Sequence, residues 1–235
     1  GTTVIDSGRN VSVNNLTGKG IKDERGKLSL TFARIVSQVK PRWCIWENVP
    51  NALRVDRGRA FGSIVGALAQ CGYGWAYRVF DLQTFGVPQR RKRLFLIGYL
   101  GDCGPAVRAL FERLPDGSDS PSSQEVEEVS VARAYRVDGW AGDETPKRGN
   151  GVCPTLKRSQ GGEGVGVIEG HRRLRKLTTV EWERLQGFPD NYTRITMPGG
   201  KEASAVQRQK AIGNSFPPPI LAWIGRRIQR IELES

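Results

Sequence analysis

The chain has 235 residues, with 36 Lys and Arg against 24 Asp and Glu and a formal net charge of +12. This length suits one large domain, or one domain with a small insert. The positive charge favours a polyanionic partner such as nucleic acid, with an anionic membrane surface as the rival. No stretch approaches the roughly 18 apolar residues of a membrane span, so we expect a soluble protein without a membrane partner, cytoplasmic and nucleoid-associated if bacterial or phage-borne, nuclear if eukaryotic.

The first hundred residues predict alternating helices and strands. Residues 1–27 are rich in Gly, Asn, Lys and Asp and are expected to be loop. Apolar residues at helical spacing predict helices over 28–39 and 60–70, and shorter apolar runs predict strands over 43–46, 75–79 and 94–99. The run Trp43-Cys44-Ile45-Trp46 has no helical spacing, which favours a strand buried on both faces. This order of elements is typical of a layered α/β domain.

The rest of the chain is less regular. A short helix is predicted over 105–114, a mobile loop over 115–130, a glycine-rich segment over 148–169, and helices over 178–186 and from 217 onward. Thr178 is expected to cap its helix, with Glu181 completing a capping box. In the last helix, Arg226, Arg227 and Arg230 are expected to stay largely outside the buried stripe.

Cysteine and histidine give no metal or disulfide pattern. Cys44, Cys71, Cys103 and Cys153 are scattered, and His171 is the only histidine. Without a Cys-x-x-Cys pair, the sequence predicts neither a zinc site nor a disulfide framework. Reduced thiols fit a cytosolic or nuclear setting.

Glu47 and Asn48 end the first predicted strand. The carboxyl ends of strands are where open α/β sheets keep their sites. A carboxylate there can hold a planar, amide-like ligand by donating or accepting a proton, if apolar surroundings raise its pKa. A strand-end Glu in water is the alternative, because perturbed groups mark sites only some of the time.

A basic run, Gln89-Arg90-Arg91-Lys92-Arg93, leads into the strand predicted over 94–99. Side chains alternate along a strand, so Gln89, Arg91 and Arg93 should point to one side and form a groove for phosphate or a carbonyl oxygen. A solvated basic segment is the alternative. Further along, Gly213-Asn214-Ser215 is expected just before a helix N-terminus, as backbone donors for a polar ligand or with Ser215 as an ordinary cap.

Taken together, these segments resemble the DNA cytosine-5 methyltransferase family. Five blocks occur in the family's order, namely Gly-Ile-Lys-Asp-Glu-Arg-Gly-Lys-Leu at 20–28, Glu47-Asn48-Val49, Gln89-x-Arg91-x-Arg93, Arg-Lys-Leu-Thr-x-x-Glu-x-x-Arg-Leu-Gln-Gly-Phe-Pro at 175–189, and Gly213-Asn214-Ser215. The likeness covers about residues 11–230. It implies an α/β fold, a partial Rossmann-like S-adenosylmethionine-dependent methyltransferase sheet with a small irregular target-recognition region.

The resemblance also implies a division of the chain and roles for particular residues. Residues 1–100 would be an incomplete catalytic domain, 101–174 the target-recognition region, and 175–235 helices that return to the catalytic domain. Glu47 would bind N3 and the amino group of a flipped cytosine, with Asn48 bracing the site. Arg93 would contact the base O2, and Arg91 would steady the active-site loop or the backbone.

Further residues are assigned to the cofactor and to DNA by the same resemblance. Leu28, Asn214 and Ser215 would line the pocket for S-adenosylmethionine. Gln89, Thr155, Leu156, Lys157 and Arg158 would contact double-stranded DNA. A base inside a duplex has to be extruded before an enzyme can reach it, and a basic surface supplies the phosphate contacts.

One departure from the family concerns the nucleophile. The family attacks cytosine C6 with the cysteine of a Pro-Cys-Gln loop and begins its cofactor pocket with Phe-x-Gly-x-Gly, and neither motif is in this chain. Where Pro-Cys-Gln is expected, the chain has residues 7–13, Ser-Gly-Arg-Asn-Val-Ser-Val. Cys44 falls inside a predicted core strand and is interpreted as a buried apolar thiol. Without a thiolate the covalent route is closed.

Three functions stay open on the sequence alone. The first is a DNA cytosine-5 methyltransferase, incomplete or inactive as this chain, whose missing blocks come from a complementing N-terminal fragment or from residues outside the given sequence. The second is a non-catalytic DNA-binding relic or accessory subunit. The third is a tRNA cytosine-5 methyltransferase of the same family, although the variable insert favours DNA. An unpaired edge of the sheet would favour self-association.

Overall fold

The computed structural model describes residues 3–6, 9–12, 24–112, 134–137, 147–148, 164–169 and 173–234. The chain divides into two compact units: unit 1 is Gly1–Phe80, Lys92–Arg113 and Ile224–Ser235, and unit 2 is Asp81–Arg91 and Leu114–Trp223. The three-part division expected from the sequence stays a prediction. No helix among the described residues is both long enough and apolar enough to cross a membrane.

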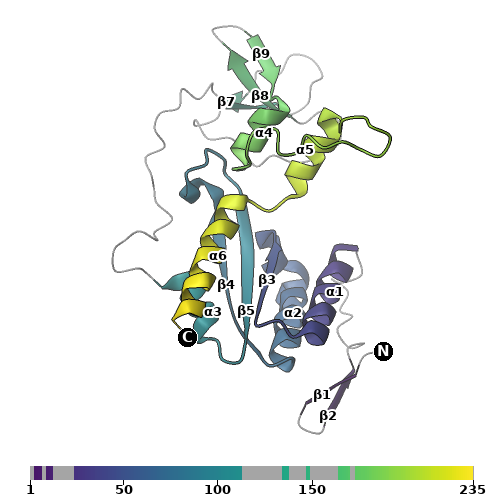
Figure 1. Cartoon of the computed structure of the whole chain (residues 1–235), viewed down its shortest axis with the longest axis vertical. Coiled ribbons are helices and arrows are strands. Elements are labelled where there is room, and N and C mark those ends of the chain that lie inside the picture. Colours follow the sequence, from purple (N-terminus) through teal and green to yellow (C-terminus); the bar gives the residue numbers. More distant parts are fainter. Residues whose placement is uncertain are drawn as a thin grey trace. The chain divides into compact units, whose positions relative to one another are not determined.

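Unit 1 holds most of the elements that the sequence predicted (Figure 1). They are β1 (Thr3–Asp6), β2 (Arg9–Ser12), α1 (Glu24–Val39), β3 (Trp43–Asn48), α2 (Arg59–Gln70), β4 (Tyr73–Asp81), β5 (Lys92–Leu100), α3 (Gly104–Phe111) and residues 224–233 of α6 (Pro218–Leu233). The expectation of loop over residues 1–27 was wrong in part. β1 and β2 pair antiparallel, and α1 begins at Glu24, because a charged first turn is compatible with a helix.

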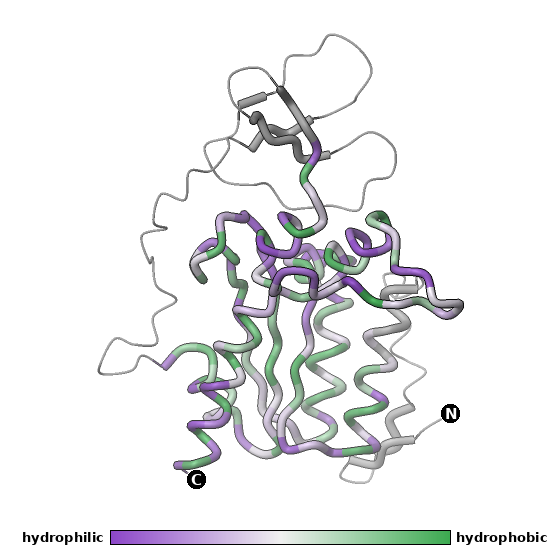
Figure 2. Tube along the Cα trace, turned by 45° about the horizontal axis from the view of Figure 1, so that its top comes forward, coloured by the Kyte–Doolittle hydropathy of each residue, from purple (hydrophilic) through white to green (hydrophobic). Residues whose placement is uncertain are grey.

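A three-stranded sheet in the order β3-β5-β4 organises unit 1. β3 runs antiparallel to β5, with Trp46 opposite Leu96 and Asn48 opposite Leu94. One face of the sheet carries Cys44, Trp46, Leu94 and Leu96. The two residues of a cross-strand pair point to the same side, and side chains alternate along each strand. These side chains form a core with Val36 of α1 and with Ile64 and Leu68 of α2, so α1 and α2 cover this face. The hydrophobic residues of unit 1 are concentrated in its strands and helices (Figure 2).

The strand at residues 43–46 is less enclosed than its apolar run suggested. Cys44 and Trp46 are buried, whereas Trp43 and Ile45 are half-buried. The expectation of burial on both faces was therefore wrong in part. The reason is topological, because β3 lies at one end of the strand order and pairs with β5 alone among the described strands.

The second face of the sheet packs against α3 and the end of α6. Phe95 and Ile97 of β5 are fully buried, as are Ala106, Ala109 and Leu110 of α3. Trp43 donates its indole N–H to Oε1 of Glu232 on α6 at 2.8 Å. Glu47 is two residues after Ile45 and four residues after Trp43 along β3, so its side chain lies on this same face.

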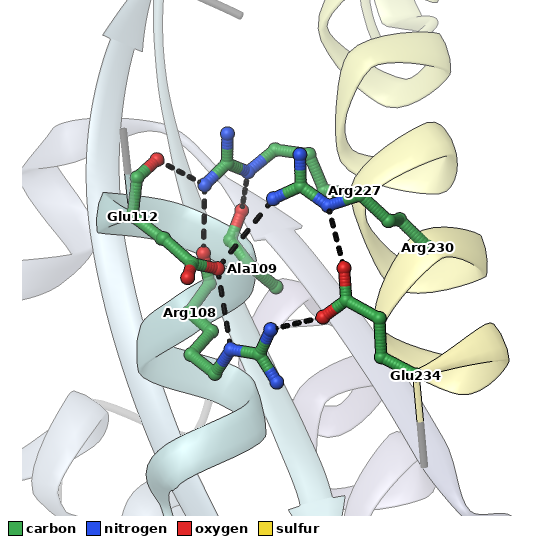
Figure 3. Close-up of polar contacts among 6 residues, drawn as sticks. All are labelled: Arg108, Ala109, Glu112, Arg227, Arg230 and Glu234. Atoms are coloured by element: carbon green, nitrogen blue, oxygen red, sulfur yellow. Dashed lines mark hydrogen bonds and ion pairs between the residues drawn. The ribbon is translucent and has the colours of Figure 1, made fainter. Parts of the chain in front are cut away.

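Arg227 is a correction to the sequence prediction. It was expected outside, and it is 2% exposed. Its guanidinium donates to the carbonyl oxygens of Arg108, Ala109 and Glu112 at the C-terminus of α3 (Figure 3). Helix C-termini leave carbonyls without intrahelical partners, so a buried guanidinium there is both satisfied and stabilising. Arg226 is exposed, as expected.

Unit 2 combines a small sheet with two helices. Its elements are η5 (Leu82–Phe85), β6 (Ala134–Val137), β7 (Lys147–Arg148), β8 (Gly164–Glu169), β9 (Arg173–Lys176), α4 (Thr179–Leu185) and α5 (Ala205–Asn214). The four strands pair antiparallel in the order β7-β6-β8-β9. These strands give regular structure to parts of residues 101–174, the region expected to be irregular. The alternation of Gly and Val in β8 is the sequence pattern that could have predicted a strand there.

The helices of unit 2 begin with matching caps. The capping box predicted for Thr178 and Glu181 is present at α4. A second capping box, Ser204 with Gln207, opens α5. The sequence did not predict α5, because its ten residues are mostly polar and only Ile212 is buried. A helix with a single apolar anchor has almost no periodic signal to detect.

Candidate functional site

Glu47 and Arg93 meet at one end of the unit 1 sheet. Glu47 lies opposite Phe95 in the register of β3 and β5. Arg93 is two residues before Phe95, so it is the diagonal neighbour of Glu47 on the same face, and long side chains reach each other across that diagonal. Arg93 Nε lies 3.0 Å from Glu47 Oε1. The convergence of a carboxylate and a guanidinium that are far apart in the sequence is therefore confirmed.

The pair is neither buried nor free in solvent. The Glu47 side chain is 28% exposed and that of Arg93 is 13% exposed. Burial lowers the pKa of Arg93 from its ordinary value, and the charge and hydrogen bond of Glu47 act in the opposite direction. Arg93 Nη1 also donates to the backbone carbonyl of Lys92 at 2.8 Å, so the guanidinium is oriented from two sides. A small polar molecule can approach a pair with this degree of exposure.

Asn48 stabilises the turn that follows β3. Its side-chain oxygen accepts the backbone N–H of Val49 at 2.8 Å. The chain then enters η3 (Pro50–Leu53), where Ala52 and Leu53 pack against the core of the sheet. Asn48 thus fixes the end of the strand that carries Glu47.

The basic run after η5 shows the predicted alternation. Gln89 and Arg91 are buried, and Arg90 and Lys92 are exposed. Arg91 uses its guanidinium within unit 2, where Nη2 donates to the backbone carbonyls of Gly213 at 3.3 Å and of Ser215 at 2.5 Å. The expected open groove of three donors is therefore wrong, because Arg91 is already bound and Gln89 has no exposed surface. The role of Gln89 in DNA binding stays a prediction.

Gly213-Asn214-Ser215 ends α5, with Ser215 as the C-cap, and lies just before α6, which begins at Pro218. The predicted position before a helix N-terminus is therefore confirmed. The expected row of backbone donors is wrong in part, because the Ser215 N–H donates to the carbonyl of Ile212 and the carbonyls of Gly213 and Ser215 accept from Arg91. The Ser215 hydroxyl is 2.7 Å from the carbonyl of Ile212, to which it donates, and 3.4 Å from Gln186 Oε1. Asn214 is exposed.

Some predicted residues fall outside the described part of the chain. They are Thr155, Leu156, Lys157 and Arg158, together with the loop at 115–130 and Cys153. Leu28 lies within α1, but its side chain is not described.

The described thiols differ in environment. Cys44 is buried, Cys71 is intermediate and Cys103 is exposed. Burial raises the pKa of Cys44 to about 11, although a backbone hydrogen bond from Gly98 acts in the opposite direction. A thiol with this pKa carries almost no thiolate near neutral pH, so Cys44 does not serve as a nucleophile in this conformation.

A buried carboxylate in unit 2 was not anticipated. Glu183 of α4 is fully buried and accepts the backbone N–H groups of Asn191 at 2.7 Å and Thr193 at 2.8 Å. It also pairs with Arg208 of α5 at 3.0 Å. The capping pattern drew attention to Glu181, and nothing in the spacing distinguished Glu183 from a solvated neighbour. Glu183 holds the connection between α4 and α5 in place.

Comparison with known proteins gives a family match and several relatives. The family model described as C-5 cytosine-specific DNA methylase matches residues 16–133 and 112–230. The chain is 33% identical over 202 residues to the Type II methyltransferase M2.BsuMI of Bacillus subtilis (strain 168), covering 81% of this chain and 49% of that protein. It is 28% identical over 233 residues to the Type II methyltransferase M.SsoII of Shigella sonnei, covering 89% of this chain and 59% of the relative.

The fold is also similar to solved methyltransferases. The crystal structure of the S. pombe Dnmt2 methyltransferase aligns with a TM-score of 0.62 and 19% sequence identity, over 91% of this chain and 73% of that one. At this identity the likeness concerns the fold, which agrees with the predicted α/β methyltransferase class. The chain spans about half the length of M2.BsuMI and 59% of M.SsoII.

Proposed function

Because the chain belongs to the family of C-5 cytosine-specific DNA methylases, we propose that it carries the base-binding part of a DNA cytosine-5 methyltransferase. The reaction transfers the methyl group of S-adenosylmethionine to C5 of a cytosine that has been turned out of the duplex. The observation that carries the proposal is the partly exposed pair of Glu47 and Arg93, 3.0 Å apart, at the carboxyl end of β3.

The chemistry of this pair suits a single pyrimidine. An extruded base is held by hydrogen bonds to its Watson-Crick edge. The Glu47 carboxyl group faces N3 and the amino group of the cytosine, and the Arg93 guanidinium donates to O2. Arg93 keeps its charge under all ordinary conditions, so it remains a donor whatever the protonation state of Glu47. In this pairing the Glu47 carboxyl group is protonated, donates to N3 and accepts from the amino group. Thymine reverses both positions, because its N3–H is a donor and its 4-carbonyl oxygen is an acceptor.

Asn48 and Arg91 act on the backbone in this proposal. Asn48 holds the turn after β3 through its bond to Val49. Arg91 holds the end of α5 through the carbonyls of Gly213 and Ser215. Gln89 and residues 155–158 would contact the DNA.

S-adenosylmethionine would supply the methyl group. Of the residues assigned to it, Asn214 fits best, because its side chain is exposed at the end of α5 and offers both an amide donor and an acceptor. Ser215 fits less well, since its hydroxyl already contacts Ile212 and Gln186. Ser215 would therefore position Asn214 rather than contact the cofactor.

The nucleophile would come from outside the described residues. Cys44 is buried with a raised pKa, and neither Cys71 nor Cys103 lies in a Pro-Cys-Gln context. A complementing N-terminal methyltransferase fragment would bring both the nucleophile and strands to pair with the edge of β3 that has no partner among the described strands. Self-association through that edge is the other arrangement that would cover it.

Exchange of Glu47 for Gln tests the base-binding role. We would measure binding of the chain to two duplexes that differ only in an unpaired cytosine or thymine. Glu47→Gln should reduce the preference for cytosine by about 5-fold to 150-fold, the roughly 1 to 3 kcal/mol by which a good bidentate contact discriminates against the wrong base. The reason is that the amide can turn over and pair with thymine as well as with cytosine. Binding to a fully paired duplex should stay nearly unchanged, because phosphate contacts carry it.

Glu234→Gln is the matched control, since it removes the same charge from a 46% exposed side chain at the end of α6. A Glu47→Gln chain that keeps its full preference for cytosine would overturn the assignment. An equal loss in both duplexes would also count against it.

Transfer of labelled methyl groups tests the reaction itself. The proposal expects incorporation into cytosine-containing duplex only when a complementing fragment is added. Incorporation by the chain alone would contradict the proposal that the nucleophile comes from a complementing fragment. Incorporation into tRNA but not into duplex would favour the tRNA methyltransferase, and specific binding without incorporation under either condition would favour a non-catalytic DNA-binding module.

A further inference from the structure

Three arginines follow the strand that carries Glu47. Arg54, Arg57 and Arg59 are all exposed, and Asp56 is the one acidic residue among them. Within the described residues, none of the three guanidinium groups takes part in an ion pair or a side-chain hydrogen bond. By contrast, the exposed arginines Arg108 and Arg184 each pair with a carboxylate. We call Arg54, Arg57 and Arg59 the basic turn.

The fold holds the basic turn in one conformation. Leu53 packs against the core of the sheet immediately before it, and α2 begins at Arg59. Asp56, Arg57 and Gly58 are three successive left-handed residues, with φ angles of 50°, 54° and 85°. Residues other than glycine rarely adopt this conformation, and such backbone persists only where the surrounding structure determines it. The turn therefore presents its arginines from a fixed backbone.

The basic turn is also near the Glu47 and Arg93 pair, both in the sequence and in the fold. Pro50 begins η3 two residues after Asn48, and η3 lies against β5, the strand that carries Arg93. The 3-10 helix η4 (Val55–Gly58) follows directly and contains Arg57. The same end of the unit 1 sheet thus carries the Glu47 and Arg93 pair and an excess of positive charge.

We propose that the basic turn binds phosphates of the nucleic-acid strand that flank the base held by Glu47 and Arg93. This rests on the proposed function. Turning a base out of the stack displaces the phosphates on either side of it, and cations fixed beside the pocket would hold the backbone in that displaced position. Arginine suits the task, because its planar fork donates two hydrogen bonds to one phosphate. Such contacts set position and affinity but carry no sequence information.

The test is the salt dependence of binding. We would replace Arg54 and Arg59 together with Gln, leaving Arg57, and measure affinity for the duplex with an unpaired cytosine at several salt concentrations. The slope of log K against log salt is negative, and each lost phosphate contact reduces its magnitude by about 0.9. The slope of the double variant should therefore be smaller in magnitude by about 1.8. Adding Arg57→Asn, which tolerates the left-handed backbone, should reduce the magnitude by about 0.9 more.

Arg34→Gln with Arg226→Gln is the matched control. Both side chains are exposed, on α1 and α6, and the control removes the same charge from unit 1. Its slope should not change. An equal fall in both double variants would overturn the proposal in favour of a general effect of net charge, and no fall in either would show that the arginines are merely solvated.

A second readout separates this proposal from the base-binding role. The Arg54 and Arg59 variant should keep its preference for unpaired cytosine over thymine, whereas Glu47→Gln should lose it. If the slope falls as expected while Glu47→Gln keeps the preference, the phosphate contact stands and the base-binding role fails. If the slope is unchanged while Glu47→Gln loses the preference, the base-binding role stands and the phosphate contact fails. Thermal unfolding of each variant checks that it is folded.

Discussion

Removal of the buried carboxylate of Glu183 should loosen the connection between α4 and α5. Glu183 Oε1 accepts from the backbone N–H of Thr193 at 2.8 Å, from the Thr193 hydroxyl at 2.5 Å and from Arg208 at 3.0 Å. Its Oε2 accepts from the backbone N–H of Asn191 at 2.7 Å. Both side chains of the ion pair are shielded, with exposures of 0% for Glu183 and 13% for Arg208. We therefore predict that Glu183→Gln destabilises the chain markedly.

The magnitude follows from counting acceptors. In Glu183→Gln the amide oxygen can take the place of Oε1, but the NH₂ group then faces the N–H of Asn191, two donors together. An unsatisfied buried donor costs about 1 to 3 kcal/mol, and the remaining bonds lose their charge assistance. Removing one partner of a buried ion pair outright costs about 3 to 5 kcal/mol. We expect Glu183→Gln to lower the free energy of unfolding by about 2 to 4 kcal/mol and Glu183→Ala by about 3 to 5 kcal/mol.

The pH dependence has a definite sign. Burial raises the pKa of Glu183, but the hydrogen bonds from Thr193, Arg208 and Asn191 outweigh it and hold the pKa below its ordinary value. A group with a depressed pKa in the folded state stabilises fully above its unfolded pKa, about 4.3 for Glu. That contribution is lost as pH falls through the folded value. The stability difference between wild type and Glu183→Gln should be full near pH 6 and shrink below about pH 4.

Urea unfolding followed by circular dichroism measures the free energy, and hydrogen exchange of the peptide over residues 188–196 measures the local effect. The amides of Asn191 and Thr193 should lose protection in Glu183→Gln. Glu202→Gln is the control, because Glu202 pairs with Arg194 on the surface, where both side chains are 57% exposed. If Glu183→Gln leaves both stability and protection unchanged, the buried carboxylate does not organise this segment.

Two further predictions concern the core and the thiols of unit 1. Gly98→Ala would place a Cβ 2.7 Å from Cys44 Sγ and 3.3 Å from Tyr73 Cδ1, so it should lower the free energy of unfolding by about 1 to 3 kcal/mol. Adding Cys44→Ala should recover part of this loss, measured by urea unfolding. No recovery would mean that the clash lies elsewhere. In a Cys153→Ser background at pH 8, Ellman's reagent should modify exposed Cys103 promptly and buried Cys44, whose pKa is raised to about 11, only on unfolding. Equal rates would contradict the burial of Cys44.

The sequence by itself determined the elements with strong local signals. Helical spacing indicated α2 to within one residue, and the pattern of Thr178 and Glu181 indicated the capping box that opens α4. These features depend on residues a few positions apart, whose interactions form within the element itself. The ordered motif blocks likewise indicated the family, and with it the expectation that Glu47 and Arg93 share a pocket.

Tertiary structure decided what depends on residues far apart in the chain. The antiparallel register of β3 and β5 brings Arg93 diagonally beside Glu47. The packing of α6 against α3 buries Arg227, which the helical pattern assigned to solvent, because the free carbonyls of α3 provide its partners. Glu183 became a buried acceptor only when the segment after α4 folded back over it. Local spacing reports which face a side chain occupies, but the partner that makes burial of a charge favourable comes from another element.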